Sequence, residues 1–145
     1  MPTRTARTAW NGSLQEGSGQ VELSSSKVGT FDVSFPKRAA DEAGGTTSPE
    51  ELIAAAHSSC YAMALSSEIG KAGGTTESLE VTAEVTLGQQ DGAPTITGIA
   101  LTVRGEVGGL DAGGFEKAAQ AAKAGCPVSK ALAAVDITLD ASLVS

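Results

Sequence analysis

The two cysteines of this 145-residue chain, Cys60 and Cys126, are the side chains best suited to carry chemistry. A cysteine thiolate can attack a peroxide oxygen, become a sulfenic acid and then condense with a second thiol to form a disulfide. Two cysteines can therefore divide the work between an attacking thiol and a resolving thiol. The alternative is that both are small, buried and unreactive, and their spacing in the sequence does not decide between the two interpretations.

The local sequence around each cysteine predicts a different acidity. Cys126 precedes Pro127 and a short predicted helix, and a helix N-terminus favours a thiolate. Cys60 lies in the middle of a long predicted helix and gains nothing from the dipole of that helix. If Cys60 is the reactive thiol, a cation must be brought to it to lower its pKa.

Arg38 is the candidate cation, and Glu50 is the candidate carboxylate that holds it. The planar guanidinium of an arginine can grip a carboxylate and a thiolate together, which makes the adjacent Lys37 a weaker candidate. Each residue also has a plain structural interpretation. Arg38 can be a solvated loop residue, and an acid such as Glu50 is stabilised in the first turn of a helix by the dipole alone.

His57 offers an alternative partner for Cys60. Residues three apart on a helix share a face, so a Cys60–His57 nucleophile pair is possible. A single histidine on an apolar helix is more often a packed residue, which is the competing interpretation.

The element that must position these residues is the predicted helix that starts after Ser48. Ser48 is a suitable N-cap, Pro49 suits the first helical position, and Glu51 completes a capping box. An alanine-rich, apolar pattern then continues to a glycine-rich break at 71–74. A helix this apolar must be buried, either by the rest of the chain or by a partner.

The remaining pattern predicts an α+β fold in a single domain, residues 1–145. Alternating apolar residues predict an antiparallel meander of three short strands: one over 3–10 that ends at an Asn11-Gly12 turn, one around 21–23 and one over 31–35. A loop over 39–47 follows. After Gly74 the pattern predicts two long strands around 79–87 and 99–107, most simply an antiparallel pair. A helix over 111–124, a short helix from 126 and a final strand over 135–143 complete the chain.

Composition limits the partners and the location. The chain has 10 basic and 17 acidic residues, a net charge of −7, which argues against nucleic acid or an anionic membrane surface as the main partner. No apolar run is long enough to span a membrane, and the N-terminus lacks the apolar core of a signal peptide, so a cytoplasmic protein is expected.

Two cysteines and one histidine cannot form a four-ligand zinc site without carboxylates. A cysteine pair in the reducing cytosol favours redox work over a static disulfide.

Two segments resemble a known family. The segment from Thr47 to Leu65, TSPEELIAAAHSSCYAMAL, resembles the signature helix of the OsmC/Ohr proteins, and of the osmotically inducible OsmC branch in particular. The segment from Lys123 to Leu132, KAGCPVSKAL, resembles the segment that holds the second cysteine of that family. The endings VDITLD (135–140) and the opening WNG (10–12) are also similar, so the resemblance covers essentially the full length.

The resemblance implies a thiol-dependent hydroperoxide reductase of oxidative stress defence that uses neither a metal nor an organic cofactor. By position in the motifs, Cys60 corresponds to the peroxidatic cysteine and Cys126 to the resolving cysteine, joined in a disulfide during turnover. Glu50 corresponds to the family glutamate and Arg38 to the family arginine. The resemblance further implies an intertwined homodimer with long helices at its centre and antiparallel sheets around them. Its substrates would be organic hydroperoxides and, less efficiently, hydrogen peroxide, with a dithiol such as a dihydrolipoyl group as reductant.

Helix geometry adds one expectation about assembly. Glu50 and Cys60 are about ten residues apart on one predicted helix, which is about 15 Å along its axis. A glutamate side chain cannot span that length, so a site that uses both residues requires two chains.

Three other functions stay open at this level. The same cysteines could serve a non-catalytic redox sensor, Cys60 and His57 could serve a hydrolase, and a small-ligand-binding dimer could carry both thiols unreactive.

Overall fold

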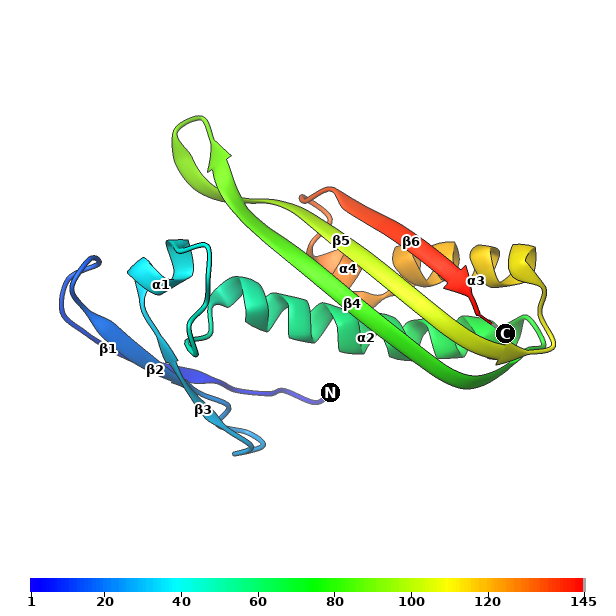
Figure 1. Cartoon of the computed structure of the whole chain (residues 1–145). Helices are drawn as coiled ribbons and strands as arrows, with labels where there is room; N and C mark the ends of the chain where they lie inside the picture. The colour runs from blue at the N-terminus through cyan, green and yellow to red at the C-terminus, as the bar shows by residue number, and fades with distance from the viewer. Residues whose placement is uncertain (145) are drawn as a thin grey trace. The chain divides into compact units, whose positions relative to one another are not determined.

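The chain divides into two compact units, Met1–Leu52 and Ile53–Ser145, in a computed structural model that describes residues 1–144. The first unit holds a small sheet and a short helix, and the second holds a larger sheet and most of the helical residues (Figure 1). This mixture confirms the predicted α+β class. No helix in the described part of the chain is long and apolar enough to cross a membrane.

The sheet of the first unit is an antiparallel meander, as predicted. Strands β1 (Arg7–Asn11), β2 (Ser18–Glu22) and β3 (Thr30–Val33) lie in the order β1-β2-β3. β1 ends at the predicted Asn11-Gly12 turn, where Gly12 has a φ of 98° that a residue with a Cβ rarely adopts. The first strand is shorter than the pattern predicted, because it begins at Arg7 and not at Thr3.

A short helix, α1 (Phe35–Ala39), replaces the end of the third predicted strand. The Ser34 hydroxyl caps it by accepting a hydrogen bond of 3.3 Å from the backbone N–H of Lys37. Pro36 occupies the first turn, where its missing N–H costs nothing. The alternation of Phe31, Val33 and Phe35 suggested a strand through this point, and the cap at Ser34 overrides it.

The long helix is α2 (Pro49–Lys71), 23 residues with the start that the sequence predicted. The backbone N–H of Glu51 donates to the Ser48 hydroxyl over 3.1 Å, which is the predicted cap. At the other end, Gly73 takes a φ of 89° and the N–H of Gly74 returns to the carbonyl of Ile69 at 2.9 Å. The glycine pair therefore stops the helix and turns the chain into the next strand.

The larger sheet is mixed, which corrects the expectation of purely antiparallel sheets. Strands β4 (Thr75–Gln90) and β5 (Ala93–Gly108) form the predicted antiparallel hairpin around Asp91 and Gly92, both of which have positive φ. The last strand, β6 (Ile137–Leu143), pairs with β5 in parallel. The physical reason is the connection: helices α3 (Ala112–Gly125) and α4 (Pro127–Ala131) carry the chain back along the sheet before β6 begins.

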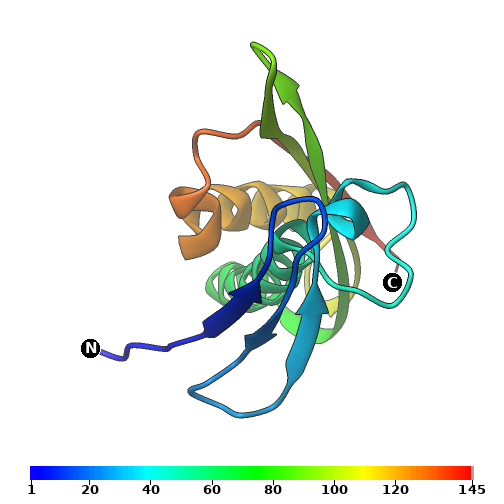
Figure 2. The same cartoon turned by 90° about the vertical axis from the view of Figure 1, so that its left-hand side faces the viewer.

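The helices α2 and α3 pack on one face of this sheet (Figures 1 and 2). Alternate residues of β5 face the helices, and Leu101 and Val103 are almost completely buried there. The buried core of the second unit consists of Tyr61, Leu65, Ile69, Leu101, Val103, Val107, Phe115, Ala118, Ala119, Ala122 and Cys126. One of the two cysteines is thus part of the hydrophobic core.

Candidate active site

The two cysteines meet in the second unit. Cys60 lies in the middle of α2 and Cys126 directly precedes α4, and their Sγ atoms are 3.0 Å apart. Both are free thiols, Cys60 partly exposed and Cys126 fully buried. Two sulfurs in contact can form a disulfide with a shift of about 1 Å, since an S–S bond is about 2.05 Å long.

Cys126 is the more acidic of the two thiols in this arrangement. Burial raises its pKa, but the polar groups of Cys60, Ser129 and Val128 around its sulfur outweigh burial and lower the pKa. For Cys60, burial and the hydrogen bond to Cys126 raise the pKa. The direction agrees with the acidity that the sequence predicted for a cysteine at a helix start.

Arg38 and Glu50 form the predicted ion pair in the first unit. The guanidinium binds the carboxylate in a bidentate ion pair: Nε donates to Oε1 over 2.9 Å and Nη2 donates to Oε2 over 2.8 Å. Glu50 is 7% exposed, and its hydrogen bonding raises the pKa of Arg38 against the opposing effect of burial. The charge of Arg38 is therefore permanent, and its side chain is fixed in direction.

Helix α1 is the element that positions Arg38, and sequence reasoning missed it. Arg38 lies in the last turn of α1, and its backbone N–H donates to the carbonyl of Ser34 at 3.0 Å. Lys37 lies one residue earlier and its ammonium approaches Gly44 instead. Of the two candidate cations, Arg38 is the one that binds Glu50.

His57 is bonded to Ser129 across the core of the second unit. Its Nε2 lies 2.8 Å from the Ser129 hydroxyl, and the ring is fully buried. Burial lowers the pKa of His57, so the ring is neutral near pH 7. Nε2 is bonded to Ser129 and Nδ1 has no hydrogen-bond partner among residues 1–144, so no hydrogen bond joins His57 to Cys60 in that range. Ser129 is a site residue that sequence reasoning missed, because nothing in its local pattern shows that it faces His57.

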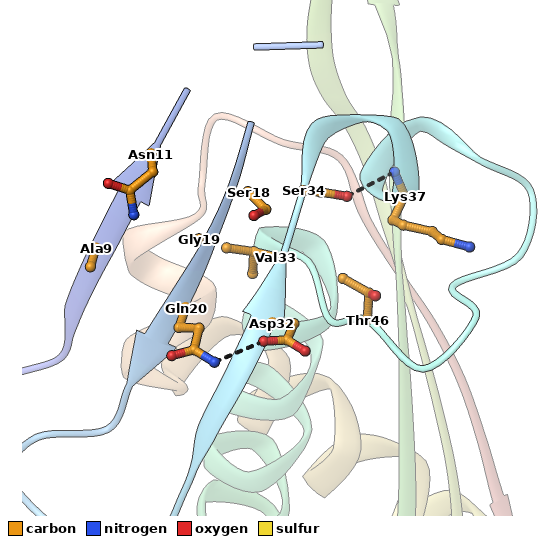
Figure 3. A pocket seen from close by; sticks show the side chains of 10 residues that line it. All are labelled: Ala9, Asn11, Ser18, Gly19, Gln20, Asp32, Val33, Ser34, Lys37 and Thr46. Carbon is orange, nitrogen blue, oxygen red and sulfur yellow. Dashed lines mark hydrogen bonds between the residues drawn. The ribbon is translucent and has the colours of Figure 1, made fainter. Parts of the chain in front are cut away.

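A surface groove of about 570 Å³ lies over the sheet of the first unit (Figure 3). Within it Gln20 donates to Asp32 over 3.1 Å, and Lys37 stands at its rim. The residues that line it are Ala9, Asn11, Ser18, Gly19, Gln20, Asp32, Val33, Ser34, Lys37 and Thr46. None of the four candidate catalytic residues is among them.

An α+β fold that brings two free thiols within 3.0 Å of each other is typical of the class of thiol redox proteins. Comparison with known proteins gives the family. Residues 41–140 match the model of the OsmC-like proteins. The chain is 45% identical over 136 residues to "Peroxiredoxin OsmC" of Escherichia coli (strain K12), an alignment that covers 94% of this chain and 93% of the relative. The same identity and coverage hold for "Peroxiredoxin OsmC" of Shigella flexneri. This chain therefore belongs to the OsmC family.

Solved structures of the family have the same fold. The organic hydroperoxide resistance protein OhrB of Bacillus subtilis is 28% identical, with a TM-score of 0.75 over 95% of this chain and 98% of that protein. An organic hydroperoxide resistance protein of Elizabethkingia anophelis is 26% identical, with a TM-score of 0.78 over 99% of this chain and 97% of that protein. The family suggested by the two cysteine segments is confirmed.

Proposed function

We propose that this protein is a cytoplasmic peroxidase that reduces organic hydroperoxides, and hydrogen peroxide less efficiently, through its two cysteines. The observation that carries the proposal is the 3.0 Å contact between Cys60 Sγ and Cys126 Sγ. The relatives named peroxiredoxins support a peroxide-reducing enzyme of this class.

The proposed cycle has three steps. The Cys60 thiolate attacks the terminal oxygen of the hydroperoxide, the O–O bond breaks, and the alkoxide leaves as an alcohol after taking up one proton. Cys126 then attacks the sulfenic sulfur, forming the S–S bond and releasing water. An external dithiol, for which a dihydrolipoyl group is the expected form, reduces the disulfide and restores both thiols.

Cys60 can act as the first nucleophile only if its thiolate is stabilised. Within one chain the hydrogen bonds favour ionisation of Cys126, and burial opposes ionisation of Cys60. In the proposed mechanism Arg38, held by Glu50, supplies the cation that reverses this preference. The permanently charged, oriented guanidinium suits that role.

We propose that the Arg38–Glu50 pair acts on Cys60 of a second subunit. Glu50 and Cys60 lie on the continuous helix α2, about ten residues and about 15 Å apart along the axis. Two α2 helices packed antiparallel about a twofold axis would bring Glu50 of one subunit towards the thiol of the other.

Exposed apolar residues support the homodimer. Met63 on α2 is 73% exposed, and Trp10 and Phe31 in the small sheet are 42% and 40% exposed. Every residue of β1 is exposed. Burial of such exposed apolar surface against a partner subunit would stabilise the dimer.

The test is a turnover assay with cumene hydroperoxide and a series of monothiol and dithiol donors. Cys60→Ser should abolish turnover, and Cys126→Ser should consume one equivalent of peroxide and then over-oxidise at Cys60. If Cys126→Ser loses the first equivalent while Cys60→Ser keeps it, the two roles are reversed. Oxidation without repeated turnover under every donor would instead indicate a redox sensor.

A further inference from the structure

The two cysteines differ in how far solvent reaches their sulfur atoms. Cys126 is 0% exposed and belongs to the buried core of the second unit, whereas Cys60 is partly exposed and packs against that core. Because the two Sγ atoms are 3.0 Å apart, a disulfide between them would have one sulfur inside the core and one at its edge. A reductant of this disulfide would therefore meet two unlike sulfur atoms.

Cys60 lies at the boundary between the buried and the exposed face of α2. His57, three residues before it, is fully buried. Ala56, four residues before it, and Met63, three residues after it, are exposed. Residues three and four apart share a face of a helix, so Ala56 and Met63 flank Cys60 on its solvent side.

The direction of attack makes this difference in exposure decisive. In thiol–disulfide exchange the incoming thiolate approaches one sulfur from the side opposite to the sulfur that leaves. For attack on Cys60, that side points away from Cys126 and out of the core. For attack on Cys126, it lies inside the core that this residue shares with Phe115, Ala119 and Ala122, which are at most 1% exposed.

We propose that the reducing thiol attacks Cys60 and that Cys126 is the sulfur that leaves. The inference rests on the proposed peroxidase function. The first thiolate of the dithiol forms a mixed disulfide with Cys60 Sγ, the bond to Cys126 breaks, and its electron pair stays on Cys126 Sγ. The second thiolate of the dithiol then attacks the sulfur of the first, which closes the disulfide of the reductant and releases the Cys60 thiolate. The dithiol loses two electrons and two protons, and the two cysteines gain them.

The acidity of the thiols agrees with this order within one chain but does not decide it. Burial raises the pKa of Cys60, whereas the polar groups around the Cys126 sulfur lower its pKa despite burial, and the thiol of lower pKa leaves faster. A cation brought to Cys60 would reduce this difference in pKa, and it would also attract an anionic thiolate to Cys60. Access to the sulfur is therefore the deciding factor.

The same path serves peroxide and reductant in the assembled protein. A hydroperoxide must reach Cys60 in the first step of the proposed cycle, so a homodimer that covers part of α2 must leave this sulfur accessible. Nothing in the cycle requires a path from solvent to Cys126, because its attack on the sulfenic sulfur takes place within the chain.

The test is to map the mixed disulfide at its first appearance. The full-length protein is oxidised with diamide, which forms the disulfide without peroxide, and is then mixed with the monothiol 2-mercaptoethanol. Samples are quenched with acid, labelled with N-ethylmaleimide and digested for mass spectrometry, and the yields are extrapolated to zero time. The mercaptoethanol adduct should be on Cys60 and the maleimide on Cys126, in at least about tenfold excess over the reverse, because attack on the buried sulfur needs a local opening. Equal adducts, or an excess on Cys126, would overturn the proposal.

Single-cysteine variants measure access independently. The Cys60 thiol in Cys126→Ser should react with 4,4′-dithiodipyridine at least about tenfold faster than the Cys126 thiol in Cys60→Ser, and unfolding in urea should bring the two rates together. Equal rates in the folded variants would contradict the proposal. If the unaltered protein consumes no peroxide while the adduct forms on Cys60, the proposed peroxidase fails and the order of exchange stands. If turnover occurs with the adduct on Cys126, only the order of exchange fails.

Discussion

The acidity of each cysteine is decided by the donors that its sulfur meets. The polar groups of Cys60, Ser129 and Val128 around the Cys126 sulfur lower the pKa of Cys126 despite complete burial. Partial burial, followed by the hydrogen bond with Cys126, raises the pKa of Cys60. A peroxidatic Cys60 thus depends on a cation that its own helix does not supply.

Arg38 is the residue whose replacement tests that dependence. Arg38→Ala should raise the pKa of Cys60 and slow the first peroxide step by at least about tenfold at neutral pH, since one pKa unit is a factor of ten in thiolate. Arg38→Lys should recover part of the rate, because an ammonium keeps the positive charge but cannot make the bidentate pair of hydrogen bonds to Glu50. Stopped-flow measurement with excess peroxide gives the rate. An unchanged rate in Arg38→Ala would mean that the Cys60 thiolate is stabilised by Lys37 or by no cation.

His57 is the only histidine, and its burial predicts a pH dependence of stability. Its folded-state pKa is lowered, so the unfolded chain binds the proton more tightly and stability is lost as pH falls through the unfolded value of about 6.5. Between pH 7.5 and pH 5.5 the free energy of unfolding should fall by about 1 kcal/mol from this residue. Urea unfolding of the unaltered protein and of His57→Gln measures the difference. An equal loss in both proteins would show that the carboxylates, and not His57, account for it.

Among the elements, close packing between β5 and α3 depends on one glycine. A Cβ at Gly105 would lie 2.8 Å from the Phe115 ring and 3.1 Å from Leu79. Gly105→Ala should therefore lower the free energy of unfolding by about 1–3 kcal/mol through overpacking. Gly98→Ala on the same strand meets nothing within 4 Å and is the matched control. Equal stability of the two variants would mean that the ring of Phe115 moves aside freely.

The sequence predicted the elements with strong periodicity and missed those set by contacts between distant segments. The cap at Ser48 and the alternation of β4 and β5 were readable locally, and so were the two cysteine segments. The parallel pairing of β6 was not readable locally, since the alternation of residues in a strand does not show whether the neighbouring strand runs parallel or antiparallel to it. The five-residue helix α1 was missed because its cap at Ser34 interrupts a strand pattern. Ser129 was missed because its partner His57 is 72 residues away.

At the scale of the whole molecule, two features support the proposed homodimer. The helix α2 separates Glu50 from Cys60 by about 15 Å along its axis, and apolar side chains such as Met63 are exposed on it. Stable burial of such a surface usually takes a partner interface of about 800 Å² per chain. In the proposed homodimer, one contact would cover the exposed side chains of α2 and bring Glu50 of one subunit towards Cys60 of the other.

Mixed dimers test the shared site directly. Cys60→Ser chains and Glu50→Ala chains should each be inactive as homodimers, the first without its nucleophile and the second with its arginine no longer held. If Glu50 of one subunit serves Cys60 of the other, a heterodimer carries one intact site and one doubly altered site. Mixing the two variants in equal amounts and exchanging subunits should then restore about a quarter of the unaltered activity, because half of the dimers are mixed and each has one working site of two.

Sedimentation before and after mixing confirms the dimer, and a Cys60→Ser chain mixed with a Cys60→Ser, Glu50→Ala chain is the control that must stay inactive. Full activity in a stable monomer would contradict the shared site, and so would a dimeric mixture that stays inactive although its subunits exchange.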